Sequence, residues 1–128
     1  MTAGEQTILL VEDHAPLRNS ISQLLARRGF HVLEAGEAKP ALALFHDHRT
    51  SIDLVVIDMM MPGMSGLDLG AELERVAPKL TILYISGYTE SIAAVSLRSQ
   101  SPDRVLLKPF TPEALLVRIN ELLGLPAA

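Results

Sequence analysis

Five short apolar segments recur along the chain with amphipathic patterns between them, and this alternation limits the possible folds more than any other feature of the sequence. The segments predict strands at Thr7–Val11, His31–Glu34, Leu54–Asp58, Thr81–Ile85 and Val105–Leu107. Runs such as VVI and ILYI contain almost no polar residue, which is typical of strands buried on both faces. Because parallel neighbours need crossover connections, strands that alternate with helices predict an α/β fold whose parallel sheet carries helices on both faces.

The first three intervening segments have the spacing of amphipathic helices. The apolar residues of the first segment fall at i, i+4, i+7 and i+8, at Leu17, Ile21, Leu24 and Leu25. Pro16 suits the first turn of this helix, and Gly29 can end it. The same spacing predicts helices around residues 38–45 and 69–76.

The two helices nearest the C-terminus differ in the clarity of their signals. A helix after Thr89 is only weakly indicated, because the segment is rich in serine. In the last helix, Thr111 can cap the first turn, Pro112 takes the first helical position and Gly124 follows the apolar stripe. We therefore expect five helices, of which the fourth has no clear boundaries.

Composition limits the size, the partners and the compartment. The 128 residues have a mass of 13.9 kDa and 48% are hydrophobic, which predicts one domain over residues 1–128 with a core from about 7 to 123. The net charge of −4 and the lack of a basic cluster argue against direct contact with nucleic acid. No apolar run is long enough for membrane insertion, and the absence of cysteine is compatible with a reducing compartment. We expect a soluble, cytoplasmic protein.

Acidic residues follow two of the predicted strands, at the place where folds of this kind bind ligands. In a flavodoxin-like (βα)5 domain the strand order is 2-1-3-4-5, and ligands sit beyond the carboxyl ends of strands one and three. Glu12 and Asp13 follow the first strand, and Asp58 ends the third. Three crowded carboxylates weaken a fold unless they share a cation, and Mg²⁺ suits such oxygen ligands. Alternatively, Glu12 and Asp13 simply begin the next helix, where acidic residues are favoured.

Two more strands end on residues that fit a site for an anionic group. Ser86 follows the fourth strand beside Gly87, whose missing side chain lets a ligand approach the backbone. Lys108 follows the fifth strand, which is otherwise apolar. Each residue alone is commonly a turn residue or a solvated charge. Together with the acidic residues, each at a separate strand end, they favour a shared site.

The segments ILLVED, VVIDMMMPGMSGLDL, ISG and LLKPFTPEAL occur in this order along the chain. They resemble the receiver domain of two-component response regulators, and the resemblance covers residues 7–123. It implies that Asp58 is the phosphoacceptor. It also implies that Asp13, Asp58 and the backbone carbonyl of Met60 bind Mg²⁺ directly, while Glu12 acts largely through water.

The resemblance also implies roles for the residues at the other strand ends. Lys108 would pair with the Asp58 carboxylate and then with the phosphoryl group, and Ser86 would donate to a phosphoryl oxygen. The Lys108–Pro109 peptide bond would be cis. These parts match the needs of phosphoryl transfer, which are an in-line nucleophile and positive charge and donors around the transferred group.

The implied function is that of a receiver that takes a phosphoryl group from a sensor histidine kinase or a histidine phosphotransfer protein. Phosphorylation would alter the face formed by the fourth helix, the fifth strand and the last helix, and so signal to a downstream protein. Such a receiver catalyses its own phosphorylation and dephosphorylation and is not otherwise an enzyme. Only three residues follow Leu125, so we expect output through a partner. A stand-alone regulator and the receiver of a hybrid histidine kinase both fit the sequence.

Three positions bear on alternatives to this interpretation. Val105 stands where many receivers have an aromatic switch residue, which lends weight to a receiver fold that has lost phosphotransfer and acts as an interaction module. A phosphatase with an aspartyl-phosphate intermediate commonly has a second acid two residues after the nucleophile, but that residue is Met60. We also hypothesise that Tyr88, together with Met60, shields the phosphoryl group from water.

Overall fold

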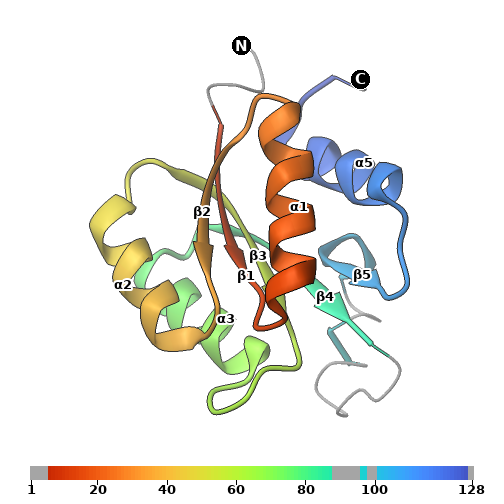
Figure 1. Cartoon of the computed structure of the whole chain (residues 1–128). Coiled ribbons are helices and arrows are strands. Elements are labelled where there is room, and N and C mark those ends of the chain that lie inside the picture. The colour runs from red at the N-terminus through yellow and green to blue at the C-terminus, as the bar shows by residue number, and fades with distance from the viewer. Residues whose placement is uncertain (1–5, 88–95, 98–100, 127–128) are drawn as a thin grey trace.

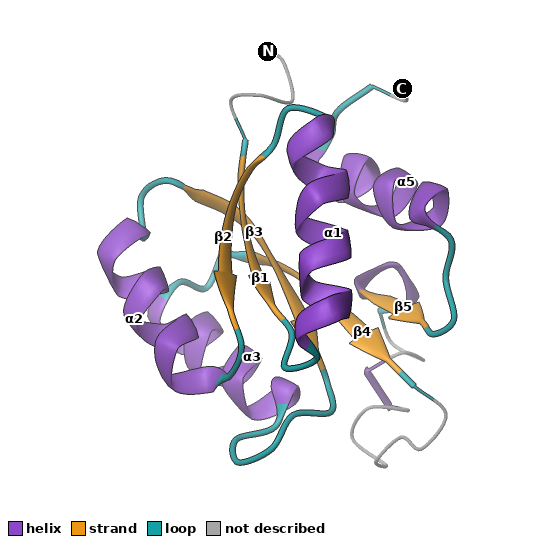
Figure 2. Cartoon of the chain, viewed as in Figure 1, coloured by secondary structure: helices purple, strands orange, loops and turns teal. Residues whose placement is uncertain are grey.

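The central element of the computed structural model is a five-stranded parallel sheet in the order β2-β1-β3-β4-β5 (Figure 1, Figure 2). The structure describes residues 6–87, 96–97 and 101–126. The strands are β1 (Thr7–Val11), β2 (His31–Ala35), β3 (Ile52–Asp58), β4 (Thr81–Ser86) and β5 (Val105–Leu107). The predicted α/β fold and its strand order are confirmed, and β2, β3 and β4 extend slightly beyond their predicted bounds.

Helices cover both faces of this sheet, as its crossover connections require. They are α1 (Ala15–Arg27), α2 (Ala38–His48), α3 (Gly66–Val76) and α5 (Pro112–Leu123), with a short 3-10 helix, η2 (Pro102–Arg104), before β5. In Figure 1, α1 and α5 lie on one face and α2 and α3 on the other. The helix predicted after Thr89 falls largely outside the described residues. Within that segment the structure describes only Ser96 and Leu97, and both are helical. No helix in the described part of the chain is both long enough and apolar enough to cross a bilayer.

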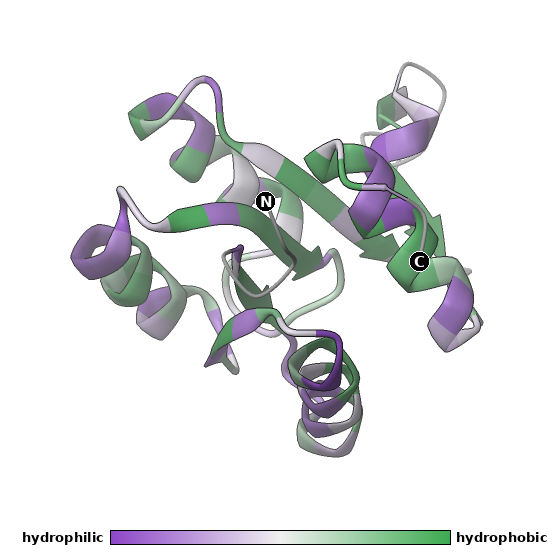
Figure 3. Cartoon of the chain, turned by 90° about the horizontal axis from the view of Figure 1, so that it is seen from above, coloured by the Kyte–Doolittle hydropathy of each residue, from purple (hydrophilic) through white to green (hydrophobic). Residues whose placement is uncertain are grey.

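The strands are apolar throughout because both faces of the sheet are covered. In β1, Ile8 and Leu10 pack on the side of α1 and α5, whereas Leu9 and Val11 pack on the side of α2 and α3. All four side chains are fully buried. Coloured by hydropathy (Figure 3), the strands are largely hydrophobic, while the helices carry residues of both kinds. Two hydrophobic layers therefore hold the strands, and with them the residues at their carboxyl ends, in fixed positions.

Two of the helices in the described residues begin with side-chain caps. The hydroxyl of Ser65 accepts a hydrogen bond from the amide of Asp68 at the start of α3 (3.2 Å), and that of Thr111 accepts one from Ala114 at the start of α5 (3.0 Å). Helix α5 ends at Gly124, whose φ of 69° lies in the left-handed region that glycine adopts without strain. The predicted start and end of this helix are confirmed.

The amino edge of the sheet, where the strands begin, is held by a polar contact. Strands β1 and β3 pair with a register shift between Thr7 and Ile8. At this shift the exposed carboxylate of Asp53 accepts a hydrogen bond from the amide of Thr7, with 2.8 Å between Oδ2 and N. The carboxylate thus provides a partner for a backbone amide at an irregularity of the sheet.

Candidate functional site

Three charged side chains meet at the carboxyl edge of the sheet because they continue the alternation of the strands. In β3, Leu54 and Val56 pack on the side of α1 and α5, and Asp58 has the same phase. Glu12 and Lys108 directly follow β1 and β5 and continue the corresponding phase of those strands. Side chains separated by many residues in the sequence are therefore brought together on one face.

The carboxylate of Asp58 is almost completely buried, with 2% of the residue exposed. The ammonium of Lys108 lies 3.2 Å from Asp58 Oδ2 and donates a hydrogen bond to it. The backbone amide of Met60 donates to the other oxygen, Oδ1, at 2.9 Å. Both carboxylate oxygens thus have partners, and the nearby ammonium offsets part of the cost of burying the charge.

Glu12 is buried as deeply as Asp58 but is less well compensated, with 1% of the residue exposed. Its Oε2 accepts a hydrogen bond from the amide of His14 (3.1 Å). Its Oε1 has no hydrogen-bond partner among the described residues, and the nearest cation, the Lys108 ammonium, lies 3.9 Å away. Burial raises the pKa of Glu12 to about 8; the His14 amide opposes this shift, the Asp58 carboxylate adds to it and Lys108 opposes it.

A third carboxylate completes an acidic cluster that has the composition of a metal site. One carboxylate oxygen from each of Glu12, Asp13 and Asp58 lies within 4.8 Å of the other two. Asp13 is exposed, whereas the other two residues are buried. Hard divalent cations prefer such oxygen ligands, and the unpartnered oxygen of Glu12 is the kind of group that a cation or its bound water would satisfy.

The loop after β3 is held close to Asp58 by the start of α3. The amide of Met59 donates to the carbonyl of Ile85 (2.9 Å), and the amide of Gly66 donates to the carbonyl of Met59 (3.0 Å). A Cβ atom at Gly66 would lie 2.2 Å from the carbonyl oxygen of Asp58, so only glycine fits at this helix start. Met60 is 56% exposed as a residue, and its backbone amide is anchored to the Asp58 carboxylate.

Ser86 and Lys108 lie side by side at the ends of β4 and β5, but only Lys108 contacts Asp58. The amide of Lys108 donates to the carbonyl of Ser86 (2.7 Å), and the Lys108–Pro109 peptide bond is cis, as predicted. The buried hydroxyl of Ser86 donates to the carbonyl of Gly87 (3.3 Å), so its proton must leave that carbonyl before Ser86 can donate to a group on Asp58.

Val105 occupies the position at which many receivers carry an aromatic switch residue, and Tyr88 is the residue expected to shield the phosphoryl group from water. Val105 is buried and pairs in register with Tyr84, and as a valine it offers no aromatic ring to rotate. Tyr88 lies outside the described residues.

The residue that sequence reasoning missed is Arg18. Its Nη1 donates to the backbone carbonyl oxygen of Glu12 at 2.7 Å. The contact depends on how α1 packs over the end of β1, and neither residue type nor spacing predicts a bond to a backbone carbonyl.

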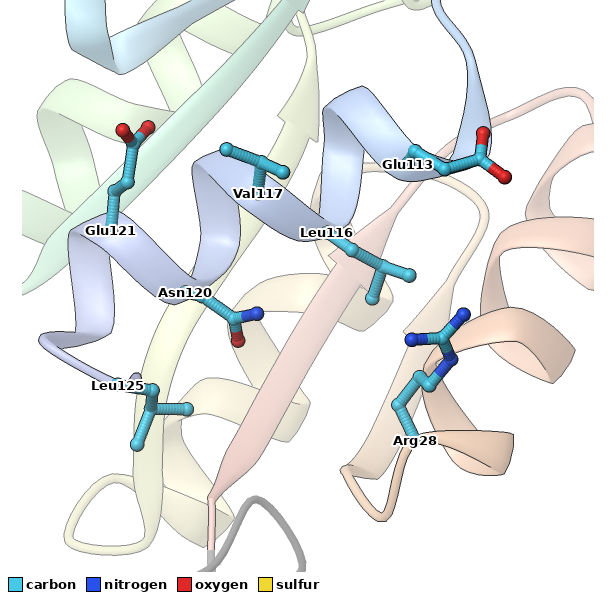
Figure 4. Close-up of a pocket in the computed structure, with 7 residues that line it drawn as sticks. All are labelled: Arg28, Glu113, Leu116, Val117, Asn120, Glu121 and Leu125. Atoms are coloured by element: carbon cyan, nitrogen blue, oxygen red, sulfur yellow. The ribbon is translucent and has the colours of Figure 1, made fainter. Parts of the chain in front are cut away.

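A groove between α1 and α5 lies at the opposite end of α1 from Glu12 (Figure 4). Arg28 approaches it from the end of α1, and the other residues that line it belong to α5 or follow it: Glu113, Leu116, Val117, Asn120, Glu121 and Leu125. Its lining combines apolar side chains with charged side chains of both signs. Since it contains no cluster of metal-ligating side chains, the acidic cluster is the stronger candidate site.

The model of the response regulator receiver domain family matches residues 8–120. The chain is 34% identical over 121 residues to the sensor kinase CckA of Brucella abortus, a match that covers 94% of this chain and 13% of CckA. It is 32% identical over 120 residues to the phosphate regulon transcriptional regulatory protein PhoB of Pseudomonas aeruginosa, covering 92% of this chain and 52% of PhoB. The chain therefore spans about half or less of the length of these relatives.

A solved structure shows the same architecture. The response regulator receiver domain protein from Clostridium thermocellum aligns with a TM-score of 0.85 and 28% identity, over 93% of this chain and 94% of that protein. The likeness extends over nearly all of the sheet and its covering helices.

Proposed function

The chain belongs to the response regulator receiver domain family, and from this we propose that Asp58 accepts a phosphoryl group in a Mg²⁺-dependent reaction. The observation that carries the proposal is the buried Asp58 carboxylate with Lys108 at 3.2 Å and the carboxylates of Glu12 and Asp13 beside it. Receiver domains are signalling modules. We therefore propose self-catalysed phosphorylation and dephosphorylation, without turnover of any other substrate.

The geometry of Asp58 suits a nucleophile in phosphoryl transfer. A carboxylate oxygen forms the new bond to phosphorus while the bond from phosphorus to the donor's leaving atom breaks. Burial at the end of a central strand fixes the carboxylate, and Lys108 can move its charge from the carboxylate to the transferred phosphoryl oxygens. Ser86 becomes a donor once its hydroxyl leaves the carbonyl of Gly87.

The acidic cluster fits a magnesium ion. Glu12, Asp13 and Asp58 would hold it. The backbone carbonyl of Met60 would join them, as the resemblance to receiver domains implies. When bound, Mg²⁺ would neutralise carboxylate charge and stabilise negative charge on the phosphoryl oxygens. Glu12 would hold a water of the ion, because its free Oε1 needs a donor and it is the most buried of the three carboxylates.

The proposed partners are a phosphohistidine donor and a downstream protein. The donor is a sensor histidine kinase or a histidine phosphotransfer protein in the cytoplasm, and neither membrane insertion nor direct contact with nucleic acid is part of the proposal. Output passes through the face that includes β5 and α5, because Lys108 links Asp58 to β5 and its amide links β5 to Ser86. Without an aromatic residue at Val105, the movement of Ser86 and β5 has to carry the signal.

A second candidate is a receiver fold that binds partners without being phosphorylated. It is favoured by the hydroxyl of Ser86, which bonds to Gly87 and not to Asp58, and by Val105 at the switch position. The two functions differ in covalent chemistry, so one measurement separates them.

The test is intact mass spectrometry after incubation with acetyl phosphate, with and without Mg²⁺. We expect wild type to gain one phosphoryl group only with Mg²⁺, and Asp58→Asn to gain none. Asp53→Asn is the matched control, because Asp53 is the other aspartate of β3 and should leave phosphorylation intact. No gain in wild type would favour the interaction module, and a gain in Asp58→Asn would place the acceptor elsewhere.

A further inference from the structure

Glu12 is held by its backbone as well as by its side chain. Its amide donates to the carbonyl of Ala35 (3.0 Å), and its Oε2 accepts from the amide of His14 (3.1 Å). Its carbonyl oxygen accepts from Nη1 of Arg18 (2.7 Å). In the described part of the chain only Oε1 of this residue is left without a hydrogen bond, and that atom belongs to the acidic cluster.

Arg18 is itself placed by two residues at the carboxyl end of β2, Glu34 within the strand and Gly36 just after it. Its Nε lies 3.8 Å from Oε1 of Glu34, and its side chain is only 25% exposed. A Cβ atom at Gly36 would lie 3.0 Å from Nη1 of Arg18, so the absence of a side chain at Gly36 leaves room for the guanidinium. The contact between Arg18 and the Glu12 carbonyl is therefore part of the packing of α1 against β1 and β2.

We propose that Arg18 is a positioning residue for the metal site, an inference that rests on the proposed Mg²⁺-dependent function. The carbonyl of Glu12 and the amide of Asp13 belong to one planar peptide unit. By fixing that carbonyl, Arg18 fixes the direction in which the chain carries Asp13 away from β1. It thereby presents the carboxylates of Glu12 and Asp13 together towards Asp58, as outer partners of metal ligands commonly do.

Because Arg18 is positively charged, its charge and its positioning role would affect Mg²⁺ binding in opposite directions. A guanidinium near a metal site repels a bound cation, so removal of its charge alone should strengthen Mg²⁺ binding. Removal of a group that orients the ligands should weaken binding instead. The two effects have opposite signs, and a positioning role requires that the second be the larger.

The experiment measures the Mg²⁺ dissociation constant by isothermal titration calorimetry, with no phosphoryl donor present. We expect Arg18→Met to raise the constant roughly tenfold. Arg27→Met is the matched control, since it removes the same charge from an exposed side chain of the same helix, and it should leave the constant unchanged or slightly lower.

Two further variants separate position from charge. Arg18→Lys keeps the charge and one donor, so it should restore part of the lost affinity. Gly36→Ala keeps Arg18 but crowds its guanidinium, so it should weaken Mg²⁺ binding by a smaller factor. That effect should disappear in the Arg18→Met background, because the crowded group is then absent.

The melting temperature of each variant without metal tells positioning from general stabilisation. A lower melting temperature with an unchanged Mg²⁺ dissociation constant in Arg18→Met would overturn the inference, and so would tighter binding. Should Arg18→Met fail to fold, wild-type affinity in both Arg18→Lys and Gly36→Ala would overturn it equally. If wild type itself binds no Mg²⁺, the proposed metal site is wrong and the role of Arg18 falls with it.

Discussion

Strand β3 carries an aspartate near each end, and the two residues have opposite relations to the fold. Asp53, at the amino end, is exposed and accepts a hydrogen bond from the amide of Thr7. Asp58, at the carboxyl end, is 2% exposed and lies against Lys108 and two other carboxylates. The residue type and the strand are the same, so the difference comes from what the neighbouring strands bring to each edge.

The amino edge of the sheet stabilises the fold, whereas the carboxyl edge destabilises it. At the amino edge a solvated carboxylate provides a partner for a backbone amide at the register shift, which stabilises the fold. At the carboxyl edge the carboxylates of Asp58 and Glu12 are buried and share a single lysine, which is unfavourable until a metal cation adds further positive charge. Substitutions at the two edges should therefore change folding and metal binding in different ways.

The largest effect is expected from a change that forces the carboxyl edge open. In Gly66→Ala the new Cβ would lie 2.2 Å from the carbonyl of Asp58, so the loop or α3 must move. We expect the free energy of unfolding to fall by roughly 2–3 kcal/mol, although alanine is the better helix former. Urea unfolding measures this loss, and Mg²⁺ titration should show weaker binding.

Gly87→Ala is the steric control for this prediction. Its added Cβ would have no atom within 4 Å, so its stability should stay close to that of wild type. Equal stabilities of Gly66→Ala and wild type would show that the contact between α3 and the end of β3 is not tight, and the contrast between the two edges would lose its structural basis.

A smaller effect is expected when the cation of the carboxyl edge is removed. Lys108→Met leaves the buried carboxylates of Asp58 and Glu12 without a positive partner, and we expect a loss of roughly 1–2 kcal/mol at pH 8 without metal. This expected loss in free energy of unfolding is smaller than for a fully buried ion pair, because the side chain of Lys108 is 33% exposed. Chemical unfolding in EDTA and in excess Mg²⁺ should show that the metal stabilises this variant more than wild type.

The matched control is Lys79→Met, which removes an exposed lysine just before β4, at the amino edge. Its stability and its response to Mg²⁺ should equal those of wild type within about 0.5 kcal/mol. If Lys79→Met and Lys108→Met behaved alike, net charge and not local burial would explain both results.

Much of the fold could be predicted because burial on both faces leaves long apolar runs in the strands. The exact ends of the strands could not be predicted, because a strand extends as far as it finds a pairing partner in the neighbouring strand. Ala35 joins β2 by pairing with Val11, Ile52 joins β3 by pairing with Thr7, and Ser86 joins β4 by pairing with Leu107. These pairings involve residues distant in the sequence, so local patterns do not contain them.

The meeting of Glu12, Asp58 and Lys108 could also be predicted, because each lies at or directly after a strand end and parallel strands end at one edge. Two other features of the site could not be predicted from the sequence. The bond from Arg18 to a backbone carbonyl depends on helix packing, and the direction of the Ser86 hydroxyl depends on a rotamer. The sequence therefore predicts which groups meet, whereas their orientation requires the structure.

The pH dependence of stability offers a third contrast between the edges. The folded-state pKa of Glu12 is about 8, against an ordinary value of 4.5, so the folded chain binds an extra proton between these values. Stability without metal should therefore fall as pH rises from about 4.5 to about 8 and level off above that range. Glu12→Gln should lack this decline and should therefore be more stable than wild type at pH 8, where about half of Glu12 is ionised in the folded wild type.

The measurement is urea unfolding in EDTA at several pH values across this window. Glu37→Gln, which changes an exposed glutamate before α2, should keep the wild-type slope. Excess Mg²⁺ should reduce the slope in wild type, since the cation favours the ionised carboxylate. A slope that is the same in wild type and Glu12→Gln would mean that Glu12 is ionised at neutral pH.

The smallest effect is expected at the amino edge, from Asp53→Asn. The amide oxygen of asparagine can still accept from Thr7, so the loss is only the extra strength of a charged acceptor in a solvated position, about 0.5 kcal/mol. The Mg²⁺ dissociation constant and phosphorylation by acetyl phosphate should match those of wild type. A weaker Mg²⁺ affinity in Asp53→Asn would mean that the register of β1 against β3 transmits strain along the sheet to Glu12 and Asp58, and the two edges would then be one coupled unit.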